Sequence, residues 1–188
     1  MKRRAFVQLA AAAVAFSPFE RMAIAAGGPL PAESLETLRA LARVVLPASL
    51  GRRAIGLLTD RFLDRVQGHR AGVEMDYGYG RFTFRRTPES PAGRYVEQLA
   101  ALERAAQLQA PSFSRLAAGA KRALVEHALR EAKVDELPDL PDGRHVASDL
   151  MAFYFQSSEA NDYCYRARIG RETCRPLKAV TVRPRPLA

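Results

Sequence analysis

The residues best suited to chemistry are a histidine and an aspartate in the last third of the chain. His145 and Asp149 are four positions apart, so on a helix they share one face. A carboxylate can orient an imidazole for proton transfer. The same pair can instead stabilise the first turn of a buried helix, where Asp149 suits the positive end of the helix dipole. Both interpretations predict a helix over residues 145–155.

No other local pattern in the sequence indicates catalysis. His69, His127 and His145 do not stand at metal-ligand spacing from the cysteines. The sequence has no covalent-haem motif, no cysteine set for an iron–sulfur cluster, no dinucleotide fingerprint and no nucleophile elbow. His127 lies on an apolar stripe, which favours a core histidine over a ligand. We expect no catalytic residue, metal or cofactor in this chain, with a small enzyme using His145 and Asp149 as the alternative.

The first 25 residues have the layout of an export signal. A basic start precedes an apolar run of roughly 14 residues, shorter than a bilayer-spanning helix, and then a small-residue Ala-x-Ala pattern. Arg3 and Arg4, followed by Phe6, resemble a twin-arginine signal. We expect cleavage between Ala25 and Ala26, with an uncleaved anchor as the alternative. Because this route exports folded proteins, usually with a cofactor, the chain either binds a cofactor or travels to the periplasm with a partner that does.

Composition favours one globular domain with a basic surface. The chain has 188 residues, of which 48% are hydrophobic, and a formal net charge of +9. About 160 residues remain after the signal, enough for one domain with a real core. Outside the cytoplasm a basic surface suits an acidic partner or anionic lipid headgroups better than nucleic acid. We expect a signal over residues 1–25, a helical domain over 26–170 and a basic, proline-rich tail over 171–188, either solvated or lying on a partner.

Apolar periodicity predicts an all-α, single-domain bundle of about five helices around a buried aromatic helix. Ser34 and Ser114 are expected to cap two helices, and Pro47 and Gly68 to end two. On the helix after Ser114 the apolar stripe includes His127, while Val125 lies off it. The expected helices cover residues 34–46, 55–66, 92–109, 114–129 and 145–155, with 158–165 either continuing the last or restarting after a kink. The helix over 145–155 is apolar almost all round, so we place it in the core.

Between the second and third helices, aromatic residues alternate with glycine and arginine. Tyr77, Tyr79, Phe82 and Phe84 recur here, and we expect an irregular loop or short hairpin near residues 74–90. These aromatics either cover the helices or dock a partner, because Tyr and Arg are enriched at interface hot spots. Stacking on single-stranded nucleic acid is the least favoured interpretation, and we expect no nucleic-acid partner.

Cys164 and Cys174 are the two cysteines of the chain. Outside the cytoplasm a disulfide between them is permitted; it would close a short loop and contribute roughly 2–3 kcal/mol. A redox-active pair is less favoured, because the spacing is not that of a Cys-x-x-Cys motif.

The layout of the chain resembles the gluconate 2-dehydrogenase subunit 3 family over roughly residues 36–170. The resemblance rests on the twin-arginine start and on four segments of the domain. These segments are Val45-Leu46-Pro47, Phe113-Ser-Arg-Leu116 with the helix that follows it, the aromatic helix from Val146 to Phe155, and Asp162-Tyr-Cys-Tyr165.

The resemblance implies a role and no catalytic residue. Members of this family are helical small subunits, without their own redox cofactor, of periplasmic sugar and sugar-acid dehydrogenases. Their large partner is a flavoprotein of the glucose–methanol–choline type, often with a cytochrome c as electron acceptor. The chain is thus expected to assist export, maturation and stability of an FAD-bearing subunit in the periplasm, or at a membrane through the complex. Tyr77, Tyr79, Phe82 and Phe84 are the docking candidates, and a free-standing periplasmic binding protein is a further alternative.

Overall fold

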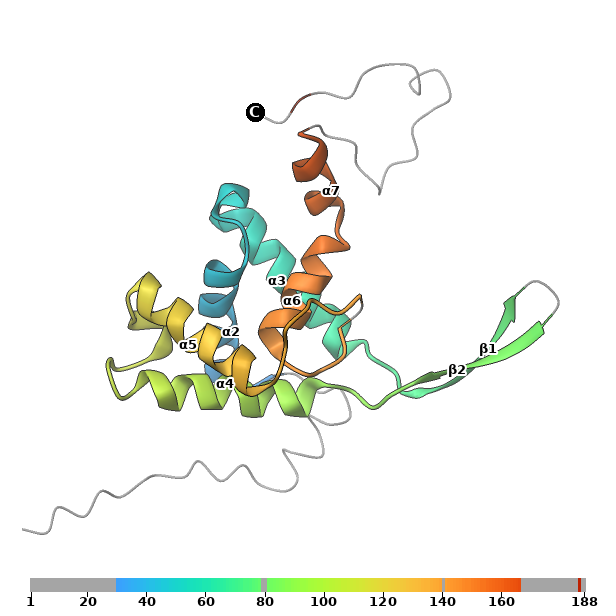
Figure 1. Cartoon of the computed structure of the whole chain (residues 1–188), viewed down its shortest axis with the longest axis horizontal. Helices are drawn as coiled ribbons and strands as arrows, with labels where there is room; N and C mark the ends of the chain where they lie inside the picture. Colours follow the sequence, from blue (N-terminus) through green and yellow to red (C-terminus); the bar gives the residue numbers. More distant parts are fainter. Residues whose placement is uncertain (1–29, 79–80, 140, 167–185, 187–188) are drawn as a thin grey trace, which may run out of the picture.

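The structure is a computed structural model that describes residues 30–78, 81–139, 141–166 and 186. This part of the chain is mostly helical, with one two-stranded antiparallel ribbon (Figure 1). The elements in order are α2 (Ala32–Val45), η1 (Ala48–Leu50), α3 (Gly51–Gln67), β1 (Gly72–Gly78), β2 (Arg81–Thr87), α4 (Ala92–Ala106), η2 (Phe113–Arg115), α5 (Ala118–Glu131), α6 (Val146–Phe155) and α7 (Ser158–Tyr165). The prediction of an all-α, single-domain fold is confirmed.

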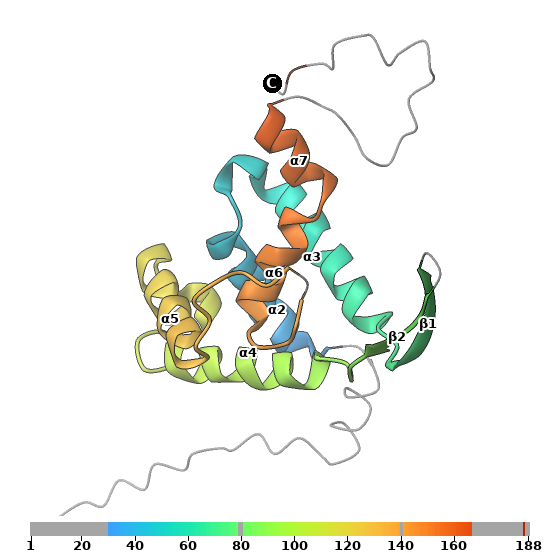
Figure 2. The ribbon, with the colours of Figure 1, turned by 45° about the vertical axis from the view of Figure 1, so that its right-hand side comes forward.

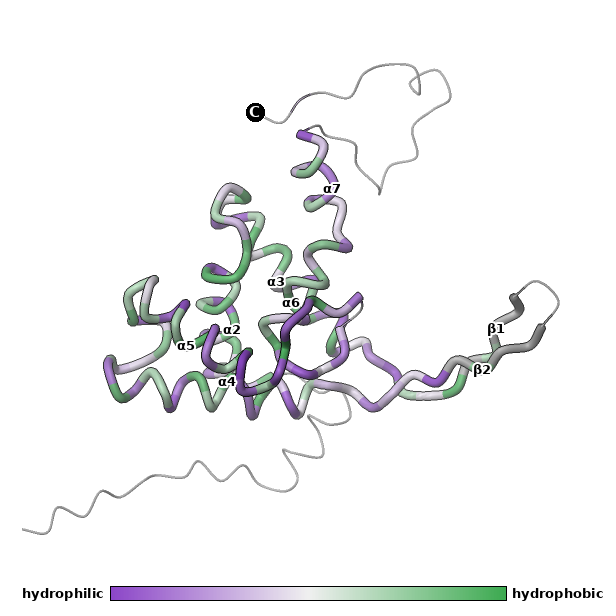
Figure 3. Tube along the Cα trace, viewed as in Figure 1, coloured by the Kyte–Doolittle hydropathy of each residue, from purple (hydrophilic) through white to green (hydrophobic). Residues whose placement is uncertain are grey.

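The core lies where α2, α3, α4 and α6 meet. Leu38 and Leu41 of α2 and Leu150 of α6 have no exposed surface. Hydrophobic residues, green in Figure 3, recur along α2, α3 and α6. Burial of apolar side chains is the main force holding such helices together, so α6 is held from several sides.

An aromatic cluster anchors α6 to its neighbours. The Phe62 ring of α3 lies 5.8 Å from Tyr95 of α4 and 5.6 Å from Phe153 of α6, measured between ring centroids. Arg65 stacks over Phe153 at 5.9 Å, within range for a cation–π contact. Seven of the ten residues of α6 are buried, which confirms the expected central aromatic helix. Phe155, its last residue, is 58% exposed.

The helix ends were predicted correctly where proline or glycine marks them and wrongly where serine does. Helix α2 ends just before Leu46-Pro47, and the Gly68 N–H closes α3 on the Asp64 carbonyl at 2.8 Å. Ser34 does not cap α2, because the helix already begins at Ala32 and Ser34 is buried in its first turn. Ser114 does not cap α5 either: it lies in η2, and its hydroxyl donates to Glu36 of α2.

The short turn η2 also changes the face that α5 presents to the core. Phe113 is fully buried but precedes the helix, which starts only at Ala118. We predicted η2 and α5 as one continuous helix, so the wrong face of α5 was expected to be apolar and buried. Val125 is the buried residue of α5. His127 is exposed and lies 3.5 Å from Glu131, so its prediction as a core histidine is wrong.

The structure has six helices in its described residues, against about five expected. The additional one arises because α6 stops at Phe155 and the chain restarts in α7. Ser157 lies between them in extended conformation, and its hydroxyl accepts a hydrogen bond from the Ala160 N–H at 3.2 Å. A serine N-cap of this kind starts a new helix.

The ribbon of β1 and β2 leaves the helical body after α3 and returns into α4. Figures 1 and 2 show it extending away from the helices in both views. The expected hairpin near residues 74–90 therefore forms, with strands over Gly72–Gly78 and Arg81–Thr87. Phe84 of β2 is 74% exposed, so this aromatic side chain is available to another molecule.

Candidate functional site

His145 is the N-cap residue of α6. The His145 side chain is nearly buried, with 3% of its surface exposed, and Nδ1 accepts a hydrogen bond from the Ala147 N–H at 3.1 Å. An accepting Nδ1 carries no proton, so the ring is neutral. Burial lowers the pKa of His145, because a charged imidazolium would lose its hydration. The imidazole is thereby committed to the helix end.

Asp149 is fully buried and serves a different set of partners. Its Oδ2 accepts hydrogen bonds from the Tyr95 hydroxyl at 2.5 Å and from the Gly143 N–H at 2.6 Å, and Oδ1 accepts from the Asp142 N–H at 3.3 Å. Burial raises the pKa of Asp149, and the hydrogen bonds only partly oppose this shift. Burial, together with the neighbouring carboxylate, also raises the pKa of Tyr95.

The side chains of His145 and Asp149 form no hydrogen bond with each other, although the Asp149 N–H donates to the His145 carbonyl at 3.0 Å. Each side chain points its polar atoms at other partners: the amide of Ala147 for His145, and Tyr95 with the preceding loop for Asp149. A proton relay needs the two groups within hydrogen-bond reach of each other. The arrangement holds a loop in place and brings no solvent-accessible acid and base together.

Gln98 of α4 also binds the loop that precedes α6. Its Nε2 donates to the Arg144 carbonyl at 2.8 Å, and its Oε1 accepts from the Val146 N–H at 2.7 Å. We call Tyr95, Gln98, Gly143, Val146 and Asp149 the latch. Sequence reasoning missed Tyr95 and Gln98 as partners, because both lie more than 40 residues away along the chain; the Asp142-Gly143 turn dipeptide was the one local signal.

The ribbon presents the second candidate site, built on its register. Met75 pairs with Phe84, and Val73 pairs with Arg86. Residues directly opposite in an antiparallel pair share a face, so these four positions lie on one side of the ribbon, which we call the ribbon face. Val73, Met75 and Phe84 are 58%, 47% and 74% exposed.

Two further docking candidates occupy the same side of the ribbon by register. Tyr77 pairs with Phe82 two positions beyond Met75 and Phe84, so both continue the ribbon face. By strand register, the positions of Tyr77, Phe82 and Phe84 fall on one side of the ribbon, and Tyr79 lies outside the described residues. The polar positions, among them the Glu74–Arg85 pair, alternate onto the opposite side.

The remaining predicted sites fall mostly on undescribed parts of the chain. The signal residues Arg3, Arg4 and Phe6 and the cleavage residues Ala25 and Ala26 lie outside the described residues, as does Cys174. Cys164 is exposed in α7, and its bond to Cys174 stays a prediction.

Comparison with protein-family models, curated proteins and solved structures found no match for this chain. The resemblance to the gluconate 2-dehydrogenase subunit 3 family accordingly stays a prediction. Within residues 30–78, 81–139 and 141–166, no group of three or more His, Cys, Asp and Glu side chains could hold a metal ion. None of the helices in these ranges is long and apolar enough to cross a membrane.

Proposed function

We propose that this chain is the non-catalytic small subunit of a periplasmic flavin-dependent dehydrogenase complex. It binds a large catalytic subunit of the glucose–methanol–choline type that holds FAD and oxidises a sugar or sugar acid, with a cytochrome c as a further possible component. The small subunit supplies the export signal and stabilises the folded large subunit during and after export.

The observation that carries this proposal is the exposed ribbon face. Phe84 and Met75 are a cross-strand pair with 74% and 47% of their surface exposed. An isolated two-stranded ribbon is at best marginally stable in water. Aromatic residues, Met and Arg are the types enriched at protein interfaces, and Arg86 lies beside Phe84 on the same side. A partner that covers this side would bury apolar surface and hold the ribbon in one conformation.

The predicted export signal is the reason that we place the complex in the periplasm. A twin-arginine signal exports proteins that have already folded, and a chain bearing Arg3 and Arg4 can carry a bound, signal-less partner with it. His145 and Asp149, the residues with the strongest catalytic pattern, are occupied in holding the end of α6 and the loop before it. This assignment favours a binding role over a catalytic one.

Purification from the native periplasm tests the proposal directly. The full chain, tagged at its C-terminus, is expected to bring down one much larger polypeptide and the absorbance band of oxidised flavin. The double substitution Met75→Ser with Phe84→Ser should reduce the flavin recovered by roughly tenfold or more, because interface anchors carry most of the binding energy. Leu108→Ser is the matched control, since Leu108 is 88% exposed on the helical body. A colourless, lone polypeptide would instead favour a free-standing binding protein.

A second experiment tests the export role. Replacing Arg3 and Arg4 together with Lys should strand the flavoprotein in the cytoplasm, because the twin-arginine machinery reads the arginine pair. Lys2→Arg is the control that keeps the pair and the charge. Normal periplasmic dehydrogenase activity in the Arg3→Lys, Arg4→Lys strain contradicts the proposal.

A further inference from the structure

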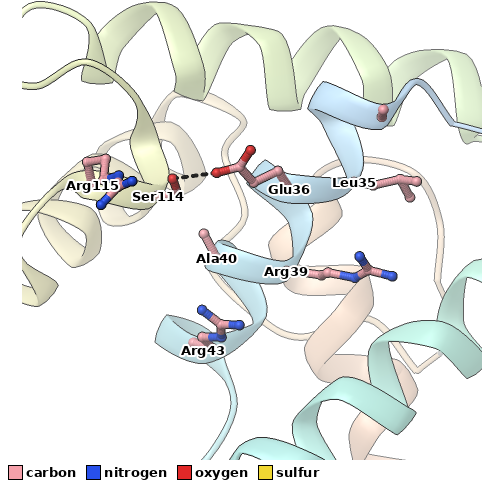
Figure 4. A pocket seen from close by; sticks show the side chains of 8 residues that line it. Leu35, Glu36, Arg39, Ala40, Arg43, Ser114 and Arg115 are labelled. Carbon is pink, nitrogen blue, oxygen red and sulfur yellow. Dashed lines mark hydrogen bonds between the residues drawn. The ribbon is translucent and has the colours of Figure 1, made fainter.

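A basic groove lies on the helical body, away from the latch. It has a volume of about 580 Å³ and runs between α2 and the turn η2. In Figure 4, Arg115 and Ser114 of η2 face Glu36, Ala40 and Arg43 of α2. Its full lining is Ala32, Leu35, Glu36, Arg39, Ala40, Arg43, Ser114 and Arg115.

The walls of this groove are held in fixed positions. Glu103 of α4 accepts a hydrogen bond from the Thr37 hydroxyl of α2 at 3.0 Å and another from the Phe113 N–H of η2 at 3.1 Å. The Ser114 hydroxyl donates to Glu36 at 2.7 Å, and Lys121 donates to the Ser114 carbonyl at 2.8 Å. These bonds set η2 against α2, so the groove is a preformed feature of the fold.

Three arginines make the groove strongly positive. The guanidinium groups of Arg43 and Arg115 form no hydrogen bond or ion pair with any other residue in the described part of the chain. Arg39 extends on the other side of Ala40 and meets Asp60 at 3.5 Å in a half-exposed pair. Such an exposed pair contributes little to stability. Because the guanidinium groups of Arg43 and Arg115 are unpaired, their N–H donors are available to a ligand.

Glu36 is the acidic residue of this lining, and its carboxylate is turned to Ser114. It offsets one of the three positive charges, and the groove keeps a net positive charge. Arginine presents a planar fork that pairs with carboxylates through two parallel hydrogen bonds. The aliphatic surface of Leu35 and Ala40 lies between the charged groups, which suits a ligand that has both carboxylates and apolar side chains.

We propose that the groove binds an acidic polypeptide segment of a partner protein, with carboxylates on Arg43 and Arg115. The chain itself is a poor source of this segment. Its segments 1–29 and 167–185 both carry more Arg and Lys than Asp and Glu, and a second copy carries the same net charge of +9. Like charges repel such occupants. A lipid surface fits less well, since a flat bilayer does not enter a hollow between a helix and a turn.

This inference does not require the partner to be a flavoprotein, and its test uses none. The probe is a fluorescein-labelled amphipathic peptide with glutamates one helical turn apart beside leucines, and fluorescence anisotropy reports its binding to the full chain at low salt. Its companion carries glutamine at every glutamate. The acidic peptide should bind at least about tenfold more tightly than its companion, because each charge-assisted hydrogen bond stabilises the complex.

Matched variants assign the binding to the groove. Arg43→Gln with Arg115→Gln should weaken binding of the acidic peptide by about tenfold or more. Arg52→Gln with Arg130→Gln removes the same charge from positions that do not line the groove and should change binding less than about twofold. Glu36→Gln should tighten binding, since it removes the carboxylate that offsets the arginines.

Three outcomes overturn the proposal. Equal losses in the two double variants would mean that net charge alone attracts the peptide. Displacement of the peptide by inorganic phosphate at constant ionic strength would indicate a small-anion site. Binding of phosphatidylglycerol vesicles that depends on Arg43 and Arg115, without peptide binding, would indicate a lipid surface. Circular dichroism of every variant checks that these exposed substitutions leave the fold intact.

Discussion

The latch and the ribbon face differ in how their side chains are matched to their surroundings. In the latch, a buried carboxylate, a buried hydroxyl and the backbone around Gly143 all find hydrogen-bond partners within 3.3 Å. On the ribbon face, Val73, Met75 and Phe84 remain exposed to solvent. One region satisfies every polar group it buries, and the other leaves apolar groups uncovered.

This difference separates stability from function. Buried polar groups are costly unless they are paired, so the latch is explained by the fold that it holds together. Exposed apolar side chains on a projecting ribbon contribute nothing comparable to the folded monomer and promote association instead. The hydrogen bonds within the chain account for the buried polar groups of the latch, whereas the exposed ribbon face is the part that we propose a partner covers.

Removal of the latch carboxylate should cause the largest loss of stability. Asp149→Ala leaves the Tyr95 hydroxyl and the Gly143 N–H buried without their acceptor, and we expect a loss of about 3–5 kcal/mol in the free energy of unfolding. Urea denaturation followed by circular dichroism measures it. The control Asp60→Ala removes a carboxylate from the exposed pair with Arg39 and should cost less than about 1 kcal/mol. Similar losses in both variants would show that Asp149 has no special role.

A side chain at Gly143 should cost about 2–3 kcal/mol. Gly143 has a φ of +76°, and an added Cβ would lie 2.9 Å from the Cβ of Pro91 and also overlap the Arg94 guanidinium. The proline ring cannot move aside as a flexible side chain could. Gly143→Ala is therefore compared with Gly119→Ala in α5, where the space is open and alanine should stabilise the helix by about 0.5–1 kcal/mol. Opposite signs are expected in thermal or urea unfolding.

Acidification should weaken the cap of α6. Burial lowers the pKa of His145 below its usual value. Its contribution to the free energy of unfolding is therefore complete above about pH 6.5 and declines as the pH falls, by at most about 1.4 kcal/mol per pH unit. Protonation of Nδ1 would also remove the acceptor for the Ala147 N–H.

Comparison of one variant with the unsubstituted chain isolates this effect. His145→Asn keeps a capping side chain and should flatten the pH dependence of unfolding between about pH 7 and 5. Asp149 acts with the opposite sign, because burial raises its pKa; this comparison removes its contribution. An unchanged profile in His145→Asn would contradict the assignment.

The sequence predicted what depends on neighbouring residues. Apolar periodicity predicted helices over residues 34–46 and 92–109, and Leu38 and Leu99 are buried in them. Pro47 and Gly68 ended their helices because the restriction lies in the residue itself. The sequence did not reveal the partners of Asp149, since Tyr95 is 54 positions away, and no local pattern records a hydrogen bond formed by packing two helices together.

The same limit explains the errors at serine. Ser34 and Ser114 are good N-caps by type, but η2 interrupts the helical phase before α5, and Ser114 instead donates to Glu36 of a distant helix. The alternation near residues 74–90 left an irregular loop and a short hairpin open, and the structure decided for the hairpin and gave its register. The groove of Arg43 and Arg115 was not predictable, because it joins residues of α2 and η2 that only the fold brings together.

The smallest effect on stability should come from the ribbon face, and it tests the comparison most directly. Met75→Ser with Phe84→Ser should change the free energy of unfolding by less than about 0.5 kcal/mol, because both side chains are already exposed. Phe62→Ala, which empties the centre of the aromatic cluster, should cost about 3–5 kcal/mol. The ribbon double variant should at the same time bind less of the dye ANS in its native state, since it removes exposed apolar surface. A loss of stability close to that of Phe62→Ala would mean that the ribbon belongs to the core of the folded monomer, and the reason to assign its exposed face to a partner would disappear.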